Sequence, residues 1–214
     1  GVFYKRYVLG LWVSAEGIIY QSFAENPQRY ILQDLSGHVP NFCTIGVDFG
    51  GNGSANAFVC TGFVHGYSEM VVLEEYYRKE IISPTQLEDD FIAFVQRCKA
   101  KYAIQDAYCD SAEQTLIQGL RTACARARIP LQVINAEKKT INDRIRAMCM
   151  LQASGRFFIL PQCAHTIEAL STALWDSKHI TEDVRLDDGS TNIDSLDALE
   201  YSYERRIREL VNAR

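Results

Sequence analysis

Residues 41–51, NFCTIGVDFGG, decide the fold. An apolar run ends there at Asp48 and a glycine cluster follows, which is the pattern of a strand that stops at a turn. Two further strand candidates come next, AFVCTGFV at 57–64 and SEMVVLEEYYR at 68–78, separated by the short HGY turn. Residues 42–78 therefore predict a three-stranded antiparallel meander.

Helices and strands alternate after the meander. Apolar residues at helical spacing predict helices, and short β-type runs between them predict strands. Strands are expected at 102–110, 131–135 and 157–160, and helices at 83–102, 111–128, 140–155, 165–175 and 192–210. This order predicts an α/β fold with a mixed sheet and helices on both faces.

Two segments are less regular. Residues 1–40 mix aromatic and turn residues without clean periodicity, and we expect an extended lead-in there. Residues 177–192 are polar, and the Asp188–Gly189 pair is a turn signal that could form the tip of a hairpin. Such a hairpin could line or gate a groove, and a plain surface excursion is the alternative.

Composition narrows the class of protein. A chain of 214 residues with 47% hydrophobic content fits one domain. Seven cysteines without a CxxC pair favour buried reduced thiols and a reducing cytoplasm. No apolar run approaches the roughly 20 residues that span a bilayer, so we expect no membrane partner. The net charge of −5 means that any basic surface for nucleic acid must be local.

Acidic residues mark the candidate site. Asp48 and Asp110 each close a predicted strand, and ligand sites in α/β sheets collect at the carboxyl ends of strands. Asp197 lies on a predicted helix, and Asp194 shares its helical face because the two are three residues apart. Structural alternatives remain for each acid, since Asp48 could build a turn and Asp110 or Asp194 could cap a helix.

Carboxylates gathered in one place repel one another and raise one another's pKa, so such a cluster persists mainly where cations occupy it. Hard oxygen ligands suit Mg²⁺ or Mn²⁺. Two such ions about 3.5 to 4 Å apart can activate a water and neutralise a scissile phosphate. The expected reaction is phosphodiester hydrolysis.

Local basic residues are candidates for phosphate contact, with a solvated helix face as the alternative. The best cluster consists of Lys138, Lys139, Arg144 and Arg146. The four histidines show no HxxxH or HNH-like spacing, which disfavours a zinc or histidine-based nuclease.

Three segments together resemble the acidic motifs of the nuclease domain of the large terminase subunit of tailed bacteriophages, a RuvC-type nuclease. They are TIGVDFGGNGSANAFVCTGF at 44–63, YCDSAEQTLI at 108–117 and IDSLDALEYSYE at 193–204. Residues 3–23 and 138–160 are also similar to segments of that family, so the resemblance covers nearly the whole chain. It implies a ribonuclease H-like nuclease domain at 41–214, with 1–40 as a linker that follows a missing ATPase domain.

The resemblance also implies function. Asp48, Asp110 and Asp197 would be catalytic metal ligands, with Asp194 as an accessory ligand. The substrate would be concatemeric double-stranded viral DNA, cut in the cytoplasm of the infected bacterial host. An N-terminal ATPase domain, a small terminase subunit and a portal protein are the implied partners. No GxxxxGK[ST] sequence occurs in this chain, so we expect it to carry only the cutting half.

Two other functions compete with this hypothesis. IGVDFGGNGSANAF at 45–58 also resembles the first phosphate loop of actin-like ATPases and sugar kinases, but their second glycine-rich loop and roughly double length are missing. The other alternative is a catalytically silent domain of the same fold that docks on DNA or a portal. A cleavage assay separates that alternative from a nuclease.

Overall fold

A six-stranded mixed sheet forms the centre of the computed structural model, which describes residues 17–51, 53–176, 178, 184–189 and 191–213. Its strand order is β5-β4-β1-β2-β3-β6. The strands are β1 (Phe42–Asp48), β2 (Asn56–Phe63), β3 (Met70–Arg78), β4 (Ile104–Cys109), β5 (Gln132–Asn135) and β6 (Phe157–Ile159). Antiparallel pairing joins β1 to β2 and β2 to β3, whereas β4, β5 and β6 pair parallel to their neighbours. The predicted meander and mixed sheet are confirmed.

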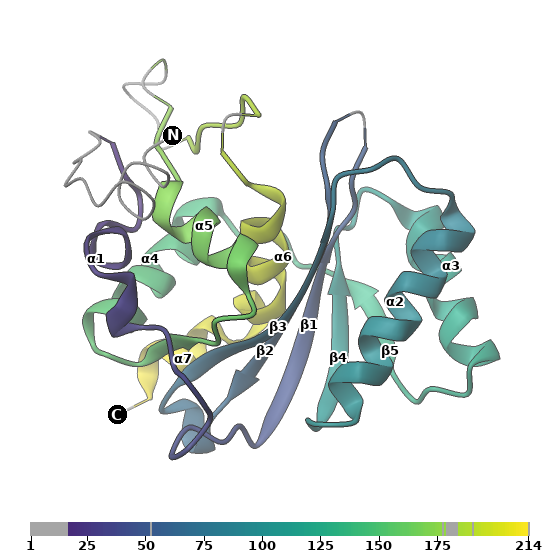
Figure 1. Cartoon of the computed structure of the whole chain (residues 1–214), viewed down its shortest axis with the longest axis horizontal. Helices are drawn as coiled ribbons and strands as arrows, with labels where there is room; N and C mark the ends of the chain where they lie inside the picture. Colours follow the sequence, from purple (N-terminus) through teal and green to yellow (C-terminus); the bar gives the residue numbers. More distant parts are fainter. Residues whose placement is uncertain (1–16, 52, 177, 179–183, 190, 214) are drawn as a thin grey trace.

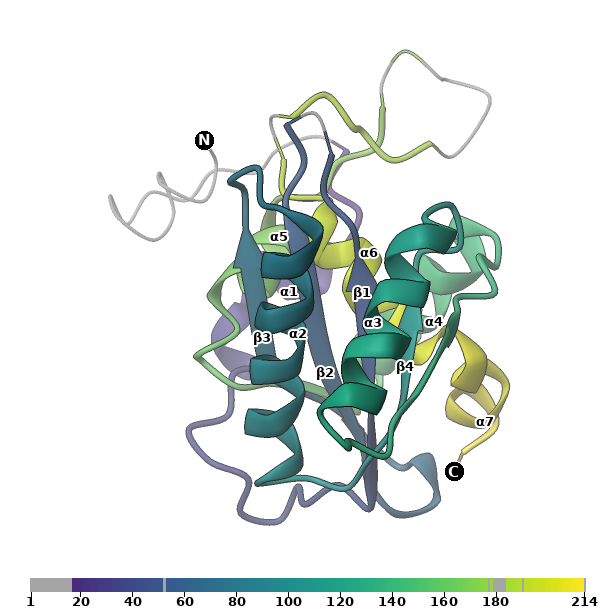
Figure 2. The same ribbon diagram turned by 90° about the vertical axis from the view of Figure 1, so that its right-hand side faces the viewer.

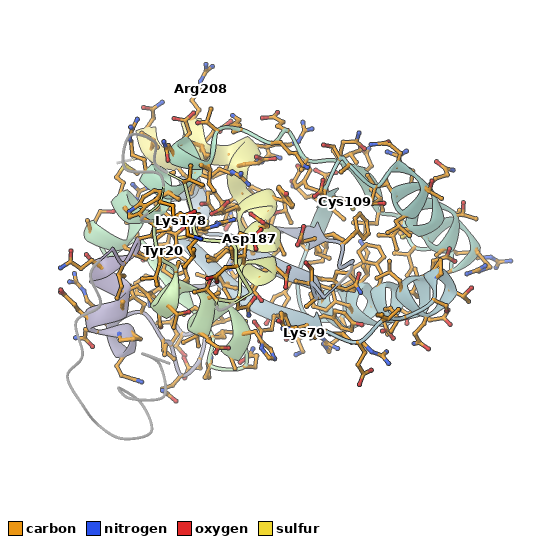
Figure 3. The ribbon with its side chains drawn as sticks, turned by 90° about the horizontal axis from the view of Figure 1, so that it is seen from above. Tyr20, Lys79, Cys109, Lys178, Asp187 and Arg208 are labelled. Atoms are coloured by element: carbon orange, nitrogen blue, oxygen red, sulfur yellow. The ribbon has the colours of Figure 1, made fainter. Side chains whose placement is uncertain are left out.

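Helices cover both faces of the sheet (Figure 1), as predicted. One face carries α2 (Pro84–Lys99) and α3 (Gln114–Arg126), which stand in front of the sheet in Figure 2. The other carries α1 (Gln21–Glu25), α4 (Ile141–Ala153), α5 (Ala164–Thr172), α6 (Asp194–Tyr203) and α7 (Ile207–Asn212). Seen from above, the sheet runs between these two helical layers (Figure 3). Each layer buries its own hydrophobic core against the sheet.

Local sequence explains where the clearest helix begins. Ser83 precedes α2, and its side chain accepts a hydrogen bond from Gln86 N at 3.1 Å, while Pro84 occupies the first turn. The apolar side chains that recur at helical spacing in α2 are buried, namely Leu87, Phe91, Phe94, Val95 and Cys98. Helix α2 therefore packs as its periodicity predicts.

The helix predicted at 192–210 is divided. Helix α6 ends at Tyr203, the 3₁₀ turn η4 (Glu204–Arg206) follows, and α7 continues from Ile207. Ser202 Oγ donates to Leu199 O, and Thr44 Oγ1 donates to Ser202 O. The first bond pairs polar groups within the last turn of α6, and the second joins the end of α6 to β1.

Residues 17–40 differ from the predicted extended lead-in. They contain α1 and the 3₁₀ turn η2 (Pro27–Arg29), and Tyr20, Phe23 and Tyr30 are buried. Phe23 stacks on Tyr30 at 5.2 Å and meets Phe157 of β6 edge-on at 6.0 Å. The aromatics enter the core from a short helix and the turns beside it, so they leave no regular period in the sequence. Residues 1–16 lie outside the described residues.

The polar stretch forms antiparallel pairing at a different place from the predicted turn. Trp175 bridges Arg185, Asp176 N donates to Val184 O, and Leu186 N donates to Leu174 O. The Asp188–Gly189 pair therefore lies after the paired residues and is not the hairpin tip. Residues 177, 179–183 and 190 lie outside the described part.

All seven cysteines are free, and six of them are buried, as predicted. Within the described residues, no helix has both the length and the apolar character that a membrane crossing requires.

Candidate functional site

Asp48 and Asp110 lie side by side at the ends of neighbouring parallel strands. Val47 of β1 pairs with Cys109 of β4, and Asp110 N donates to Val47 O at 3.0 Å. Neighbouring strands lie about 4.8 Å apart, so the next residue on each strand adds a carboxylate to the same sheet edge. The prediction that strand ends bring these two acids to one edge of the sheet is confirmed.

The alternation of β1 decides which way Asp48 points. Cys43, Ile45 and Val47 belong to the core beneath α2 and α3. The alternate positions therefore face α6, where Thr44 bonds Ser202 and Gly46 meets the helix backbone. Asp48 continues this row and faces the same helix.

Gly46 allows α6 to approach β1 very closely. A Cβ atom at Gly46 would lie only 1.7 Å from Ala198 O and 2.7 Å from Ser202 N. No residue with a side chain fits there unless the helix moves. Because Asp197 immediately precedes Ala198, this backbone contact places Asp197 at the edge of the sheet where Asp48 lies.

Asp194 connects the first turn of α6 to the loop that follows β1. Its Oδ2 accepts a hydrogen bond from Ala55 N at 2.9 Å. Asp194 and Asp197 both lie in that first turn, where the helix dipole favours negative charge. We call Asp48, Asp110, Asp194 and Asp197 the acidic site.

The four carboxylates interact electrostatically. Burial, and then the charges of Asp197, Asp194 and Asp110, raise the pKa of Asp48 well above its ordinary value. Burial followed by the charges of Asp197, Asp48 and Asp110 also raises the pKa of Tyr201. Two strands and one helix have therefore placed like charges within range of one another, which costs free energy in the absence of cations.

Side-chain cations offset part of this repulsion. Lys138 Nζ lies 2.5 Å from Asp110 Oδ1, and the guanidinium of Arg185 pairs with Asp197. The loop that carries Lys138 is held by the buried carboxylate of Glu204. This carboxylate accepts from the backbone N–H groups of three successive residues, Glu137 at 2.6 Å and Lys138 and Lys139 at 3.0 Å.

The predicted basic residues separate into three environments. Lys138 reaches the acidic site, whereas Lys139 and Arg146 line a groove of about 480 Å³ between α4 and α7. Arg144 differs from its prediction as a phosphate contact or solvated residue. It is only 8% exposed and lies 3.0 Å from Glu200, so its positive charge is paired with a buried carboxylate.

The capping alternatives are wrong for both acids. Helix α3 begins at Gln114 after Glu113, and Asp110 instead accepts from Ala112 N at 2.8 Å. Asp194 lies inside α6 after Ile193 and bonds the distant Ala55. Neither carboxylate therefore caps its helix.

Sequence reasoning missed Arg185, Glu200 and Glu204. The signal for the two glutamates was their spacing, because acids at 194, 197, 200 and 204 recur every three or four residues along one helical face. Arg185 carried no such signal, since it lies in an irregular polar stretch.

Carboxylate oxygens are the ligands that hard divalent cations prefer, and their mutual repulsion here fits a site that gains from Mg²⁺ or Mn²⁺. Among the described residues, no three His, Cys, Asp or Glu side chains already converge in ligand geometry. Two of the four carboxylates are instead engaged by Lys138 and Arg185. The donor chemistry fits a metal site in which some of the carboxylates still have to turn toward the ion.

The fold and site together define an α/β domain with a carboxylate cluster at the strand ends. Solved structures with this fold include large terminases and their nuclease domains. The large terminase of a thermophilic bacteriophage has a TM-score of 0.66 at 24% identity, covering 94% of this chain and 48% of its own. The chain thus spans about half the length of that protein.

Separate nuclease domains match over nearly their full length. The P22 large terminase nuclease domain has a TM-score of 0.66 at 16% identity, covering 92% of this chain and 98% of its own. The SPP1 large terminase nuclease domain, solved with bound Mn, has a TM-score of 0.60 at 18% identity, covering 82% and 92%. No protein-family model and no curated protein matches the sequence. The expected likeness to large terminase nuclease domains is confirmed at the level of the fold.

Proposed function

We propose that this chain is a metal-dependent endodeoxyribonuclease, the DNA-cutting domain of a bacteriophage large terminase. The observation that carries the proposal is the acidic site, where β1, β4 and α6 bring four carboxylates together on a fold shared with terminase nuclease domains. The bound Mn of the SPP1 domain supports a divalent cation as the cofactor.

In this proposal Asp48, Asp110 and Asp197 hold two Mg²⁺ or Mn²⁺ ions, with Asp194 as an accessory ligand. When bound, the ions supply an activated water and neutralise charge on the scissile phosphate. Asp194 also fixes the loop after β1 through Ala55 N.

Lys138 is proposed to act beside these ligands. Its ammonium already lies against Asp110, so it is in place to attract a phosphate oxygen once that carboxylate binds metal. Lys139, in the loop before α4, and Arg146, on α4, remain proposed contacts to the DNA backbone.

Substrate and partners follow from the same proposal. The substrate is double-stranded viral DNA in concatemers, cut during genome packaging in the cytoplasm of the infected bacterium. The large terminase of the thermophilic bacteriophage has also been solved in complex with ADP, which supports an ATPase domain as the rest of such a polypeptide. The small terminase subunit and portal protein are proposed partners of the whole protein.

Plasmid cleavage tests the activity. The parent chain should nick and linearise supercoiled DNA with Mn²⁺ or Mg²⁺ and stop when EDTA is added. Asp48→Ala and Asp197→Ala should each lower the rate at least about 10³-fold, because each removes a proposed metal ligand. Asp89→Ala, which removes an exposed carboxylate on α2, is the matched control and should cut like the parent.

Thermal melting should show that all three variants are folded. Cutting by Asp48→Ala at the parent rate would refute the assignment. A folded parent that neither binds Mn²⁺ nor cuts would instead support a silent docking domain.

A further inference from the structure

Arg185 is a buried arginine that connects the acidic site to a second carboxylate. It is 7% exposed, and its two terminal nitrogens reach different partners. Nη1 donates to Glu200 Oε1 at 2.7 Å, and Nη2 donates to Asp197 Oδ1. The planar guanidinium therefore spans two acids that lie three residues apart on α6.

Glu200 holds Arg185 in place from the protein interior. Its side chain is fully buried and also accepts from the hydroxyl of Tyr20 at 3.2 Å. Arg144 of α4 lies 3.0 Å from its other oxygen. Contacts from the segment before α1, from α4 and from the segment before α6 thus meet at one carboxylate, so Arg185 has little freedom to move.

We propose that Arg185 is a positioning residue that orients Asp197 for metal binding. This inference rests on the proposed function. Among the interactions of the described residues, Arg185 bonds Asp197 through Oδ1, so it fixes the carboxylate by one oxygen, and Oδ2 is the oxygen proposed to bind the ion. A carboxylate that is held in its working orientation loses less side-chain entropy when it binds metal, and groups that orient metal ligands typically contribute about 10 to 100-fold in affinity.

The opposite role for Arg185 predicts the opposite result. A guanidinium that merely competed with the ion for Asp197 would weaken metal binding, and its loss would strengthen it. Removing the positive charge alone would also strengthen metal binding, because the site would then be more negative and attract cations more strongly. The test must therefore alter the geometry of Arg185 while keeping its charge.

Arg185→Lys meets this requirement. Lysine keeps the charge but has one nitrogen, which cannot span Glu200 and Asp197 as the guanidinium does. We expect the Kd for Mn²⁺, measured by calorimetry in the intact chain, to rise about tenfold. The cleavage rate at saturating Mn²⁺ should fall as well. An unchanged or lower Kd would overturn the proposal.

Two further variants keep the experiment decisive. Arg126→Lys makes the same change in an exposed arginine of α3, which pairs with Glu88 away from the acidic site, and should leave Kd and rate unchanged. Tyr20→Phe removes only the hydroxyl that donates to Glu200 and should raise the Kd about two- to threefold. This effect is weaker than that of Arg185→Lys, because the guanidinium that spans Glu200 and Asp197 is still present. If Arg185→Lys does not fold, Tyr20→Phe decides, and an unchanged Kd there overturns the proposal.

Failure of the proposed function gives a different pattern. A parent chain that binds no Mn²⁺ and does not cut removes both the nuclease assignment and the role of Arg185. A parent that binds and cuts, together with an Arg185→Lys variant that matches it, removes the role of Arg185 alone.

Discussion

Replacing Gly46 with alanine tests how closely α6 must dock on β1. The added methyl group would meet Ala198 O at 1.7 Å, Ser202 N at 2.7 Å and Ala198 C at 2.9 Å. All three atoms belong to the backbone of α6, so no side-chain rotation can relieve the contact. The helix or the strand has to move as a unit.

The structure sets the size of that movement. To reach an ordinary contact distance of 3.4 Å, the methyl group and Ala198 O must separate by at least about 1.7 Å. Overpacking typically costs about 1 to 3 kcal/mol, and a clash with rigid backbone belongs at the upper end, so we expect the free energy of unfolding to fall by about 3 kcal/mol. For a chain of this length that lowers the melting temperature by about 6 to 12 °C.

The same movement separates Asp197 from Asp48. Misplacement of catalytic groups by about 1 Å can cost 10²-fold in rate, so the folded variant should cut DNA at least about 10²-fold more slowly. Urea unfolding measures the first effect, and plasmid cleavage well below the melting temperature measures the second.

Gly51→Ala is the matched control. It makes the same chemical change in the loop after β1, where an added methyl group meets nothing within 4 Å. This variant should unfold and cut like the parent. If Gly46→Ala were also within about 0.5 kcal/mol of the parent and cut at the same rate, the close approach would not be what assembles the acidic site.

Two more outcomes follow from the buried carboxylates. Burial and neighbouring charges raise the pKa of Asp48, so its ionised form opposes folding. This cost is complete above the raised pKa, shrinks as the pH falls below it, and vanishes below the ordinary pKa of a carboxyl group. In EDTA at pH 8, Asp48→Asn should therefore melt at least about 2 °C higher than the parent, with a smaller gain in acid; an equal or lower midpoint at pH 8 would contradict this. Glu204→Gln should lower the free energy of unfolding by about 1 to 3 kcal/mol, because an amide NH₂ would face N–H donors in the loop of Lys138. Hydrogen exchange at residues 137–139 should accelerate, and unchanged protection there would count against the anchoring role of Glu204.

Local patterns predicted much of the fold. The strand that ends at Asp48 could be recognised from its apolar run and the glycines behind it, and α2 from Ser83, Pro84 and its apolar face. These features depend on neighbours in the chain, so the sequence displays them directly. The placement of Asp110 beside Asp48 followed from the general rule about strand ends, and the structure agrees.

Contacts between distant segments could not be read in this way. Tyr20 and Glu200 are 180 residues apart, and neither residue indicates the other in the sequence. Arg144 belonged to a helix with a basic run, which suggested an exposed position. Its pairing with Glu200 offsets the cost of removing its charge from water, and this compensation depends on a partner that only the folded chain supplies.

The docking of α6 on β1 also has a consequence for the order of events during synthesis. Asp48 emerges from the ribosome about 150 residues before Asp197, and the helix that completes the cluster comes after all six strands. A nascent chain that has already formed its sheet still lacks the final carboxylates, because they arrive only with α6. In the proposed nuclease, a translation product that stops before residue 197 therefore lacks one of the proposed metal ligands, and we expect it not to cut DNA.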